Sequence, residues 1–82
     1  MAVYHVYVLQ SAKNNKRYVG YTSLTPEQRL LQHNRGCNTW TRHNRPFKLV
    51  YSELYAEKAE ASQRERYLKS GSGRKFLNGI LK

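Results

Sequence analysis

Five side chains of this sequence are suited to acid–base or charge-stabilising chemistry: Tyr7, Tyr18, Arg29, His33 and Glu65. A phenol can orient a water or take its proton, a guanidinium presents a fixed fork of donors to an anion, and a carboxylate can hold a divalent cation. Hydrolysis of a phosphodiester needs these abilities, because a water must lose a proton while negative charge develops on the phosphate and on the leaving oxygen. The elements that carry the five residues determine whether they meet.

The two tyrosines lie on segments that favour β-strands, Val3 to Leu9 and Arg17 to Thr22. The residues Lys13-Asn14-Asn15-Lys16 between them favour a turn, so we expect a β-hairpin. Side chains alternate between the faces of a strand, which places Tyr7 on one face with Tyr18, Gly20 and Thr22. The other face is more apolar and collects Tyr4, Val6, Val8, Val19 and Tyr21. A glycine inside a strand often marks a close approach to the backbone, so we expect the Gly20 face to receive a ligand and the other face to pack.

The segment Thr25-Pro26-Glu27-Gln28 predicts the start of a helix, with threonine as N-cap and glutamine three residues later. The helix should run to about Asn34 and stop before Gly36. Arg29 and His33 lie four residues apart and therefore project from one side of it. On spacing alone, this side could equally be a solvated face.

Residues 36–46 show no sustained periodicity and are expected to form a loop. Together with its neighbour Arg35, this segment is basic through Arg42, His43 and Arg45, and it contains one aromatic residue, Trp40. Such a segment suits phosphate contacts and stacking of a base or sugar. The alternative for Trp40 is that it folds back over the small core.

Phe47 to Tyr55 predicts a third strand, and Glu57 to about Lys69 predicts the longest helix. Ala61 and Leu68 form the apolar stripe of this helix, and Glu65 falls between them on the core side. An unpaired carboxylate there would be costly, so Glu65 needs a cation. A salt bridge to an arginine and a divalent metal ion are the two alternatives.

The run Ser70-Gly71-Ser72-Gly73 is expected to end the long helix, and Arg74 to Leu81 to form a short last helix. The glycines either present backbone N–H groups to a phosphate or serve only as a C-cap and turn.

Composition predicts one small domain, residues 1–82, because a chain of this length buries only about 60% of its unfolded surface. Fifteen lysines and arginines against five acids, all glutamates, give a formal charge of +10. This charge favours nucleic acid over a membrane surface, since no helix shows a strongly apolar face beside the cations. The small number of carboxylates argues against a two-metal site. The single cysteine, Cys37, has no partner for a disulfide or a zinc motif. We expect a reducing, cytoplasmic location and no membrane segment.

These features resemble the GIY-YIG nuclease domain, in which two tyrosine-containing tripeptides on a hairpin contribute to a phosphodiesterase site. Here the tripeptides are Val6-Tyr7-Val8, which lacks the family's glycine, and Tyr18-Val19-Gly20. The pair Arg29 and His33 matches the family's arginine and histidine on the next helix, and Glu65 matches its metal-binding glutamate. The stretch Tyr67-Leu68-Lys69-Ser70-Gly71, followed by Gly73-Arg74, is typical of small stand-alone bacterial members (UPF0213-like). The resemblance implies an α/β (α+β) fold: a small central three-stranded, mostly antiparallel sheet flanked by helices, in the order β-β-α-β-α-α.

The resemblance also implies a role for each residue. Tyr7 would be the general base, with its pKa lowered from about 10 by nearby cations such as Arg29 and His33. Tyr18 would orient the water or the substrate, Arg29 would stabilise the developing charge, and Glu65 would bind one Mg²⁺ or Mn²⁺. We expect Tyr7, Tyr18, Arg29 and Glu65 to converge on one pocket. Substrate contacts are expected from Gly20, Arg35, Trp40, Arg42, Arg45, Lys69, Arg74 and Asn78.

Two classes of function follow. The first is a metal-dependent endonuclease that hydrolyses DNA, as in repair or recombination, with no obligate protein partner. The second is a non-catalytic basic module that binds DNA or RNA, and a ribosomal-type RNA-binding protein would also fit the size and charge. The five residues favour the nuclease, because a protein that only binds would have no use for a half-buried glutamate among arginines.

Overall fold

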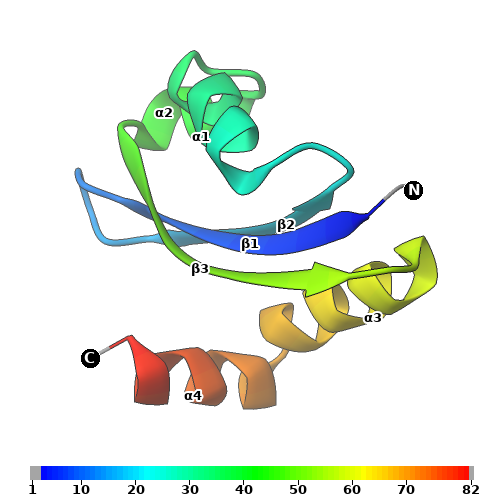
Figure 1. Ribbon diagram of the computed structural model, residues 1–82. Coiled ribbons are helices and arrows are strands. Elements are labelled where there is room, and N and C mark those ends of the chain that lie inside the picture. Colours follow the sequence, from blue (N-terminus) through cyan, green and yellow to red (C-terminus); the bar gives the residue numbers. More distant parts are fainter. Residues whose placement is uncertain (1–2, 82) are drawn as a thin grey trace.

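The computed structural model describes residues 3–81, so Met1, Ala2 and Lys82 of the predicted single domain 1–82 lie outside the described residues. Its elements are β1 (Tyr4–Ser11), β2 (Arg17–Thr22), α1 (Pro26–Asn34), α2 (Thr39–Asn44), β3 (Phe47–Tyr55), α3 (Lys58–Lys69) and α4 (Gly71–Ile80). The strands form an antiparallel sheet in the order β2-β1-β3. Helices α1 and α2 cover one face, and α3 and α4 cover the other (Figure 1). The predicted sheet and order of elements are confirmed, with α2 as an additional helix.

The hairpin pairs odd positions with even ones, so that Tyr7 lies opposite Gly20 and Leu9 opposite Tyr18. Its turn includes Asn15 at φ 62°, a left-handed conformation that asparagine tolerates better than most residues. The predicted division between the two faces is confirmed. Tyr4, Val6, Val8, Val19 and Tyr21 belong to the core under α3 and α4, and Tyr7 and Tyr18 to the core under α1.

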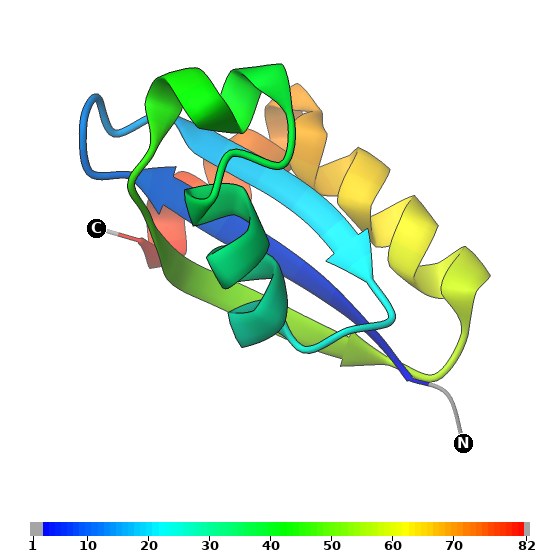
Figure 2. The same ribbon diagram turned by 90° about the horizontal axis from the view of Figure 1, so that it is seen from above.

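Strand β1 is the centre of the molecule, because it is buried on both faces (Figure 2). The core toward α3 and α4 consists of Val6, Val8, Val19, Ala61, Leu68 and Leu77. The core toward α1 consists of Tyr7, Leu9 and Phe47, with Tyr18, Leu30 and Leu49 packed against them. The sheet is thus the middle of three layers, and each core is thin. Within residues 3–81, no helix is long and apolar enough to cross a membrane.

Helix α1 has the predicted bounds and the predicted cap. The Thr25 hydroxyl accepts from the Gln28 N–H at 3.2 Å, and the Gln28 side chain accepts from the Thr25 N–H at 2.9 Å. The predicted loop over residues 36–46 is wrong, because α2 forms there. Its N-terminus is capped by a similar pair of reciprocal hydrogen bonds, which Asn38 and Thr41 make with each other. Six residues are too few to show a helical period, and the asparagine–threonine pair differs from the usual signature.

Helix α4 begins at Gly71, whereas the sequence predicts a start at Arg74. The Ser70 hydroxyl caps it by accepting from the Gly73 N–H at 3.2 Å, so this donor is already used within the protein. Gly73 is also the point where the two helices approach most tightly: a Cβ there would lie 2.0 Å from the Tyr67 carbonyl oxygen and 2.4 Å from Leu68 Cα. The glycine run therefore lies inside a helix, and Gly73 permits its close approach to α3.

Replacing Gly73 with alanine should lower the free energy of unfolding by about 1–3 kcal/mol or more, because backbone atoms of α3 must move. The matched control is Gly79→Ala in the same helix, where an added Cβ meets nothing within 4 Å. That change should stabilise the protein by up to about 1 kcal/mol through helix propensity. Urea unfolding of both variants measures the difference. Equal midpoints would mean that the helices do not pack through Gly73.

Candidate active site

Gly20 makes room for the side chain of Tyr7. A Cβ added to Gly20 would lie 2.5 Å from Tyr7 Oη and 2.7 Å from its Cζ, so only glycine fits beneath the phenol ring. Tyr7 itself is 1% exposed. The close approach predicted at Gly20 therefore exists, but the approaching group is Tyr7. Gly20 thus has a role in seating Tyr7, and its predicted contact with substrate stays a prediction.

Helix α1 places Arg29 and His33 directly over the Tyr7 hydroxyl. Tyr7 Oη lies 2.9 Å from His33 Nε2 and 3.3 Å from Arg29 Nε, and Arg29 Nη2 lies 3.2 Å from His33 Nε2. The Tyr18 ring packs beside them, with its centroid 4.5 Å from the His33 ring and 6.3 Å from the Tyr7 ring. Four of the five predicted catalytic side chains thus meet, and we call Tyr7, Tyr18, Arg29 and His33 the tyrosine cluster.

The donors of Arg29 determine where the protons of this cluster lie. A guanidinium can only donate, so His33 Nε2 accepts from Arg29 and carries no proton in the neutral ring. The imidazole proton is then on Nδ1, which lies 3.3 Å from the sulfur of Cys37. Tyr7 accepts from Arg29 Nε, and its hydroxyl donates to the single lone pair of His33 Nε2, which it shares with Arg29 Nη2 in a three-centre bond. The phenol proton is therefore held between Tyr7 and His33.

Burial controls the charges of the cluster. It lowers the pKa of His33 to about 4, with a further contribution from the positive charge of Arg29, so the imidazole is neutral at pH 7. Burial also raises the pKa of Tyr7, and the hydrogen bond and charge of Arg29 only partly offset this effect. The expectation that nearby cations lower the pKa of Tyr7 holds for Arg29 alone, because His33 is uncharged, and burial outweighs the effect of Arg29, so that the pKa of Tyr7 is raised.

Glu65 belongs to the helix that covers the face of the sheet opposite to Tyr7, so the two side chains approach any shared pocket from different faces, and their convergence stays a prediction. This helix is α3, whose residues Ala61 and Leu68 pack on the opposite face of the sheet. The Glu65 carboxylate is half-buried and lies 3.4 Å from Lys69 Nζ, so the required cation is a lysine rather than an arginine. The neighbouring Arg64 is engaged with Glu53 of β3 at 2.9 Å. Successive helix positions are about 100° apart, so Glu65 points in a different direction from Arg64, and its partner Lys69 reaches the edge of the sheet formed by β2.

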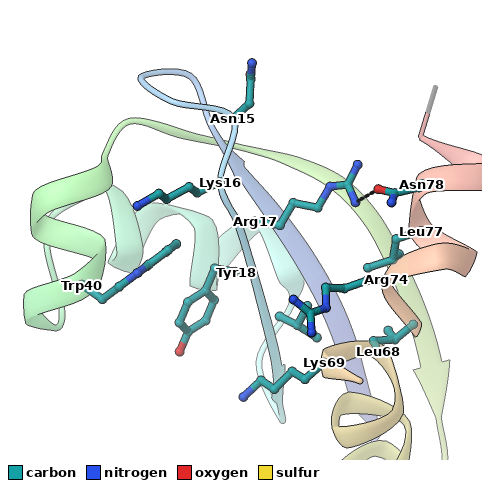
Figure 3. Close-up of a pocket in the computed structure, with 11 residues that line it drawn as sticks. Asn15, Lys16, Arg17, Tyr18, Trp40, Leu68, Lys69, Arg74, Leu77 and Asn78 are labelled. Carbon is teal, nitrogen blue, oxygen red and sulfur yellow. Dashed lines mark hydrogen bonds between the residues drawn. The ribbon is translucent and has the colours of Figure 1, made fainter. Parts of the chain in front are cut away.

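A groove of about 810 Å³ runs along β2 at the edge of the sheet (Figure 3). Lys16, Tyr18 and Trp40 lie on one side of it, and Lys69, Arg74 and Asn78 on the other. Tyr18 belongs to the tyrosine cluster, and Lys69 contacts Glu65. The groove therefore lies between the tyrosine cluster on one face of the sheet and Glu65 on the other. We call it the edge groove.

The edge groove contains four of the predicted substrate-binding residues: Trp40, Lys69, Arg74 and Asn78. Arg35, Arg42 and Arg45 are exposed and do not line it, so their predicted contacts with substrate stay predictions. Trp40 does fold back over the core, because its ring stacks on Phe47 at 5.7 Å, but it remains 37% exposed, and its contact with substrate stays a prediction. Lys16 and Arg17 line the groove and were missed. The basic pair directly before Tyr18 was visible, but the position of β2 at the sheet edge was not.

Comparison with known proteins shows the family of this fold. The GIY-YIG catalytic domain matches residues 3–78. This chain belongs to the GIY-YIG family. A UPF0213 protein from Staphylococcus haemolyticus is 38% identical over 81 residues, covering 98% of this chain and 96% of the relative. One from Clostridium perfringens is 42% identical over 66 residues, covering 79% and 69%. The solution NMR structure of a UPF0213 protein from Bacillus halodurans superposes with a TM-score of 0.57 at 30% identity, covering 95% of this chain and 84% of that one.

The GIY-YIG assignment raises the question of whether the chain can hold a divalent ion. Among residues 3–81, no three histidine, cysteine or glutamate side chains come together as a metal site. Glu53 is occupied by Arg64, Tyr51 and Tyr55, whereas the one ionic contact of Glu65 within the described part of the chain is with the half-exposed Lys69. Mg²⁺ commonly takes one or two carboxylates and fills its other positions with water and phosphate oxygens. Glu65 therefore fits one such ion, and not a fully protein-ligated site.

The buried neutral imidazole predicts a pH dependence of stability. Because the pKa of His33 falls from 6.5 to about 4 on folding, the unfolded chain binds more protons between these values. Stability from this residue is fully present above pH 6.5 and is lost as the pH falls toward 4, by on the order of 3 kcal/mol. Urea unfolding from pH 4 to 7 should show this loss in the unmodified chain but not in His33→Gln. The exposed-site control His43→Gln should retain it. An unchanged slope in His33→Gln would contradict the buried neutral imidazole.

Proposed function

We propose that this GIY-YIG chain is a divalent-metal-dependent endonuclease that hydrolyses DNA phosphodiester bonds in the edge groove. The observation that supports the proposal is the position of the groove between the tyrosine cluster and Glu65. Tyr18 belongs to both the cluster and the groove, and Lys69 lines the groove while contacting Glu65. A phosphate held there by Lys69 or Arg74 would lie between a proton acceptor on one side and a carboxylate on the other.

The tyrosine cluster can accept the proton of the attacking water without first ionising Tyr7. When Arg29 turns toward a bound phosphate, it uncovers Tyr7 Oη. The proton of the attacking water then passes to Tyr7 Oη, and the phenol proton passes along the 2.9 Å hydrogen bond to His33 Nε2. This relay suits a phenol whose pKa is raised and an imidazole that is unprotonated at neutral pH. An incoming phosphate would also offset the charge of Arg29, which helps to lower the pKa of His33.

Positive charge for the reaction comes from two directions. Arg29 lies beside the Tyr7 oxygen and can direct its donors to the phosphate as negative charge develops. Glu65 would hold Mg²⁺ or Mn²⁺, which when bound supplies charge for the leaving oxygen. Lys69, now paired with Glu65, would then be free to contact the phosphate.

The alternative is a module of the same fold that binds nucleic acid without cutting it. The cations of the groove serve either function. The buried cluster favours the nuclease, because binding a polyanion requires neither a phenol–imidazole hydrogen bond in the core nor a half-buried carboxylate beside the groove.

Replacing Glu65 with glutamine should lower the cleavage rate by orders of magnitude while DNA binding survives or tightens, because the charge that holds the ion is lost and the shape is kept. Arg29→Ala should cost about 3 kcal/mol or more in transition-state stabilisation, with only slightly weaker binding. Glu60→Gln, at an exposed position of the same helix, is the matched control and should cut normally. The assay uses plasmid, branched and flapped DNAs with Mg²⁺ or Mn²⁺, since branched and flapped forms arise in repair and recombination.

The outcomes of this assay separate the two functions. If the unmodified protein binds every substrate and cuts none with either ion over a broad pH range, the binding module replaces the nuclease. If it cuts and Glu65→Gln cuts equally well, the ion is held elsewhere.

Binding to duplex DNA should weaken steeply as salt rises and should depend little on sequence, because the formal charge of +10 favours phosphate contacts. A plot of the logarithm of the association constant against the logarithm of salt concentration measures the number of phosphates neutralised. Arg74→Ala should reduce its slope by roughly one phosphate contact. A flat plot would exclude phosphate contacts as the main source of affinity.

A further inference from the structure

The edge groove combines two kinds of side chain that duplex DNA would not use together. Four cationic residues line it, Lys16, Arg17, Lys69 and Arg74, with no carboxylate among the lining residues that the structure describes. Two aromatic rings, Tyr18 and Trp40, line it as well. Cations attract any phosphate chain, but ring faces select for bases that can stack on them.

The geometry points to single-stranded DNA as the ligand of the edge groove, with an unpaired base stacked on Trp40. This inference names the substrate class of the proposed nuclease and rests on that function. In a duplex the bases stack on one another and offer only their edges in the grooves, so an indole face has no partner there. In a single strand each base has a free face, and each phosphate remains available to the cations.

Trp40 is held in place for such a contact before any ligand arrives. Its ring stacks on Phe47 with centroids 5.7 Å apart and planes inclined by 25°, and it meets the Tyr18 ring at 5.5 Å. A tryptophan that served only to cover the core would be largely buried, yet Trp40 is more than one third exposed. Because its neighbours already fix the ring, stacking a base on it would lose little conformational entropy.

The cations of the groove are also arranged in advance. The Arg17 guanidinium donates to Asn78 Oδ1 at 2.7 Å, which orients it across the groove and leaves its other donors for a phosphate (Figure 3). Arg74 and Lys69 extend from the opposite side, where α3 meets α4. A strand lying along β2 would therefore have cations on both sides and an aromatic platform at one end.

The position of Tyr18 connects this ligand to the proposed chemistry. Its ring contacts Trp40 on one side and His33 on the other. A base on Trp40 would therefore bring the neighbouring part of its strand toward the tyrosine cluster. The strand held by stacking would be the one that is cut.

The test uses the fluorescence of Trp40, the single tryptophan of the chain, with metal chelated so that no strand is cut. The protein is titrated with three ligands of equal length: an unpaired thymidine strand, a duplex, and an abasic strand that keeps the phosphates but lacks bases. The unpaired strand should quench the emission and bind roughly tenfold or more tightly than the other two. The abasic strand should bind by charge without quenching. Equal quenching by the abasic strand, or tighter binding of the duplex, would overturn the inference.

Variants measured by anisotropy of labelled strands add an independent comparison. Trp40→Leu keeps apolar cover on Phe47 and should reduce affinity for the unpaired strand to that for the abasic strand, whereas Trp40→Phe should restore most of the difference. Arg74→Ala should weaken all three ligands by a similar factor. If Trp40→Leu is folded and still prefers the unpaired strand, stacking on Trp40 is excluded. If Trp40→Leu does not fold, the quenching experiment on the unmodified protein decides, and equal quenching by the unpaired and abasic strands excludes stacking.

These binding results do not depend on cleavage. A protein that cuts duplex DNA without preferring unpaired strands would keep the proposed nuclease and lose this inference. A protein that prefers unpaired strands and cuts nothing would keep the ligand class and lose the nuclease.

Discussion

The hydrogen bonds that join Tyr7, Arg29 and His33 hold α1 against the sheet. The buried residues of this helix are Pro26 and His33, and Leu30 supplies its main apolar contact with the core beneath. A buried donor or acceptor that loses its partner costs about 1–3 kcal/mol. The tyrosine cluster is therefore part of the core of this face as well as a candidate site, and its geometry is fixed before any substrate binds.

A second polar network fixes the helix on the other face. Glu53 of β3 accepts hydrogen bonds from Tyr51, Tyr55 and Arg64, and the Arg64 guanidinium lies about 5 Å from the ring centres of Tyr67 and Phe76. This network determines the rotation of α3 about its axis. Because Glu65 directly follows Arg64 and Lys69 lies one turn later, that rotation also places Lys69 in the edge groove while it contacts Glu65. The Arg64–Glu53 ion pair takes no part in the proposed chemistry, but it orients the helix that carries Glu65 and Lys69.

Local sequence signals predicted the elements, and the arrangement of the layers limited what could be predicted about the site. The alternation of apolar and polar side chains in residues 3–22 and the capping box at Thr25 depend on neighbours in the chain. The sequence was therefore sufficient to predict the two faces of the hairpin and helix α1. Helix α2 was too short to show a period. The side of the sheet that carries Glu65 depends on how β3 joins β1 and on where α3 crosses, which no short motif encodes. The neutrality of His33 likewise depends on burial by residues distant in sequence.

Strand β2 is an outer strand, so one side of its backbone has no neighbouring strand within the sheet. Such an edge can template pairing with another chain and thereby seed aggregation. Lys16 directly precedes this strand and Arg17 begins it, and both line its open side, where charged side chains of two copies would repel each other. Solubility and attraction of a polyanion thus depend on the same charges. A bound nucleic-acid strand would neutralise those charges while it covered the edge that they protect.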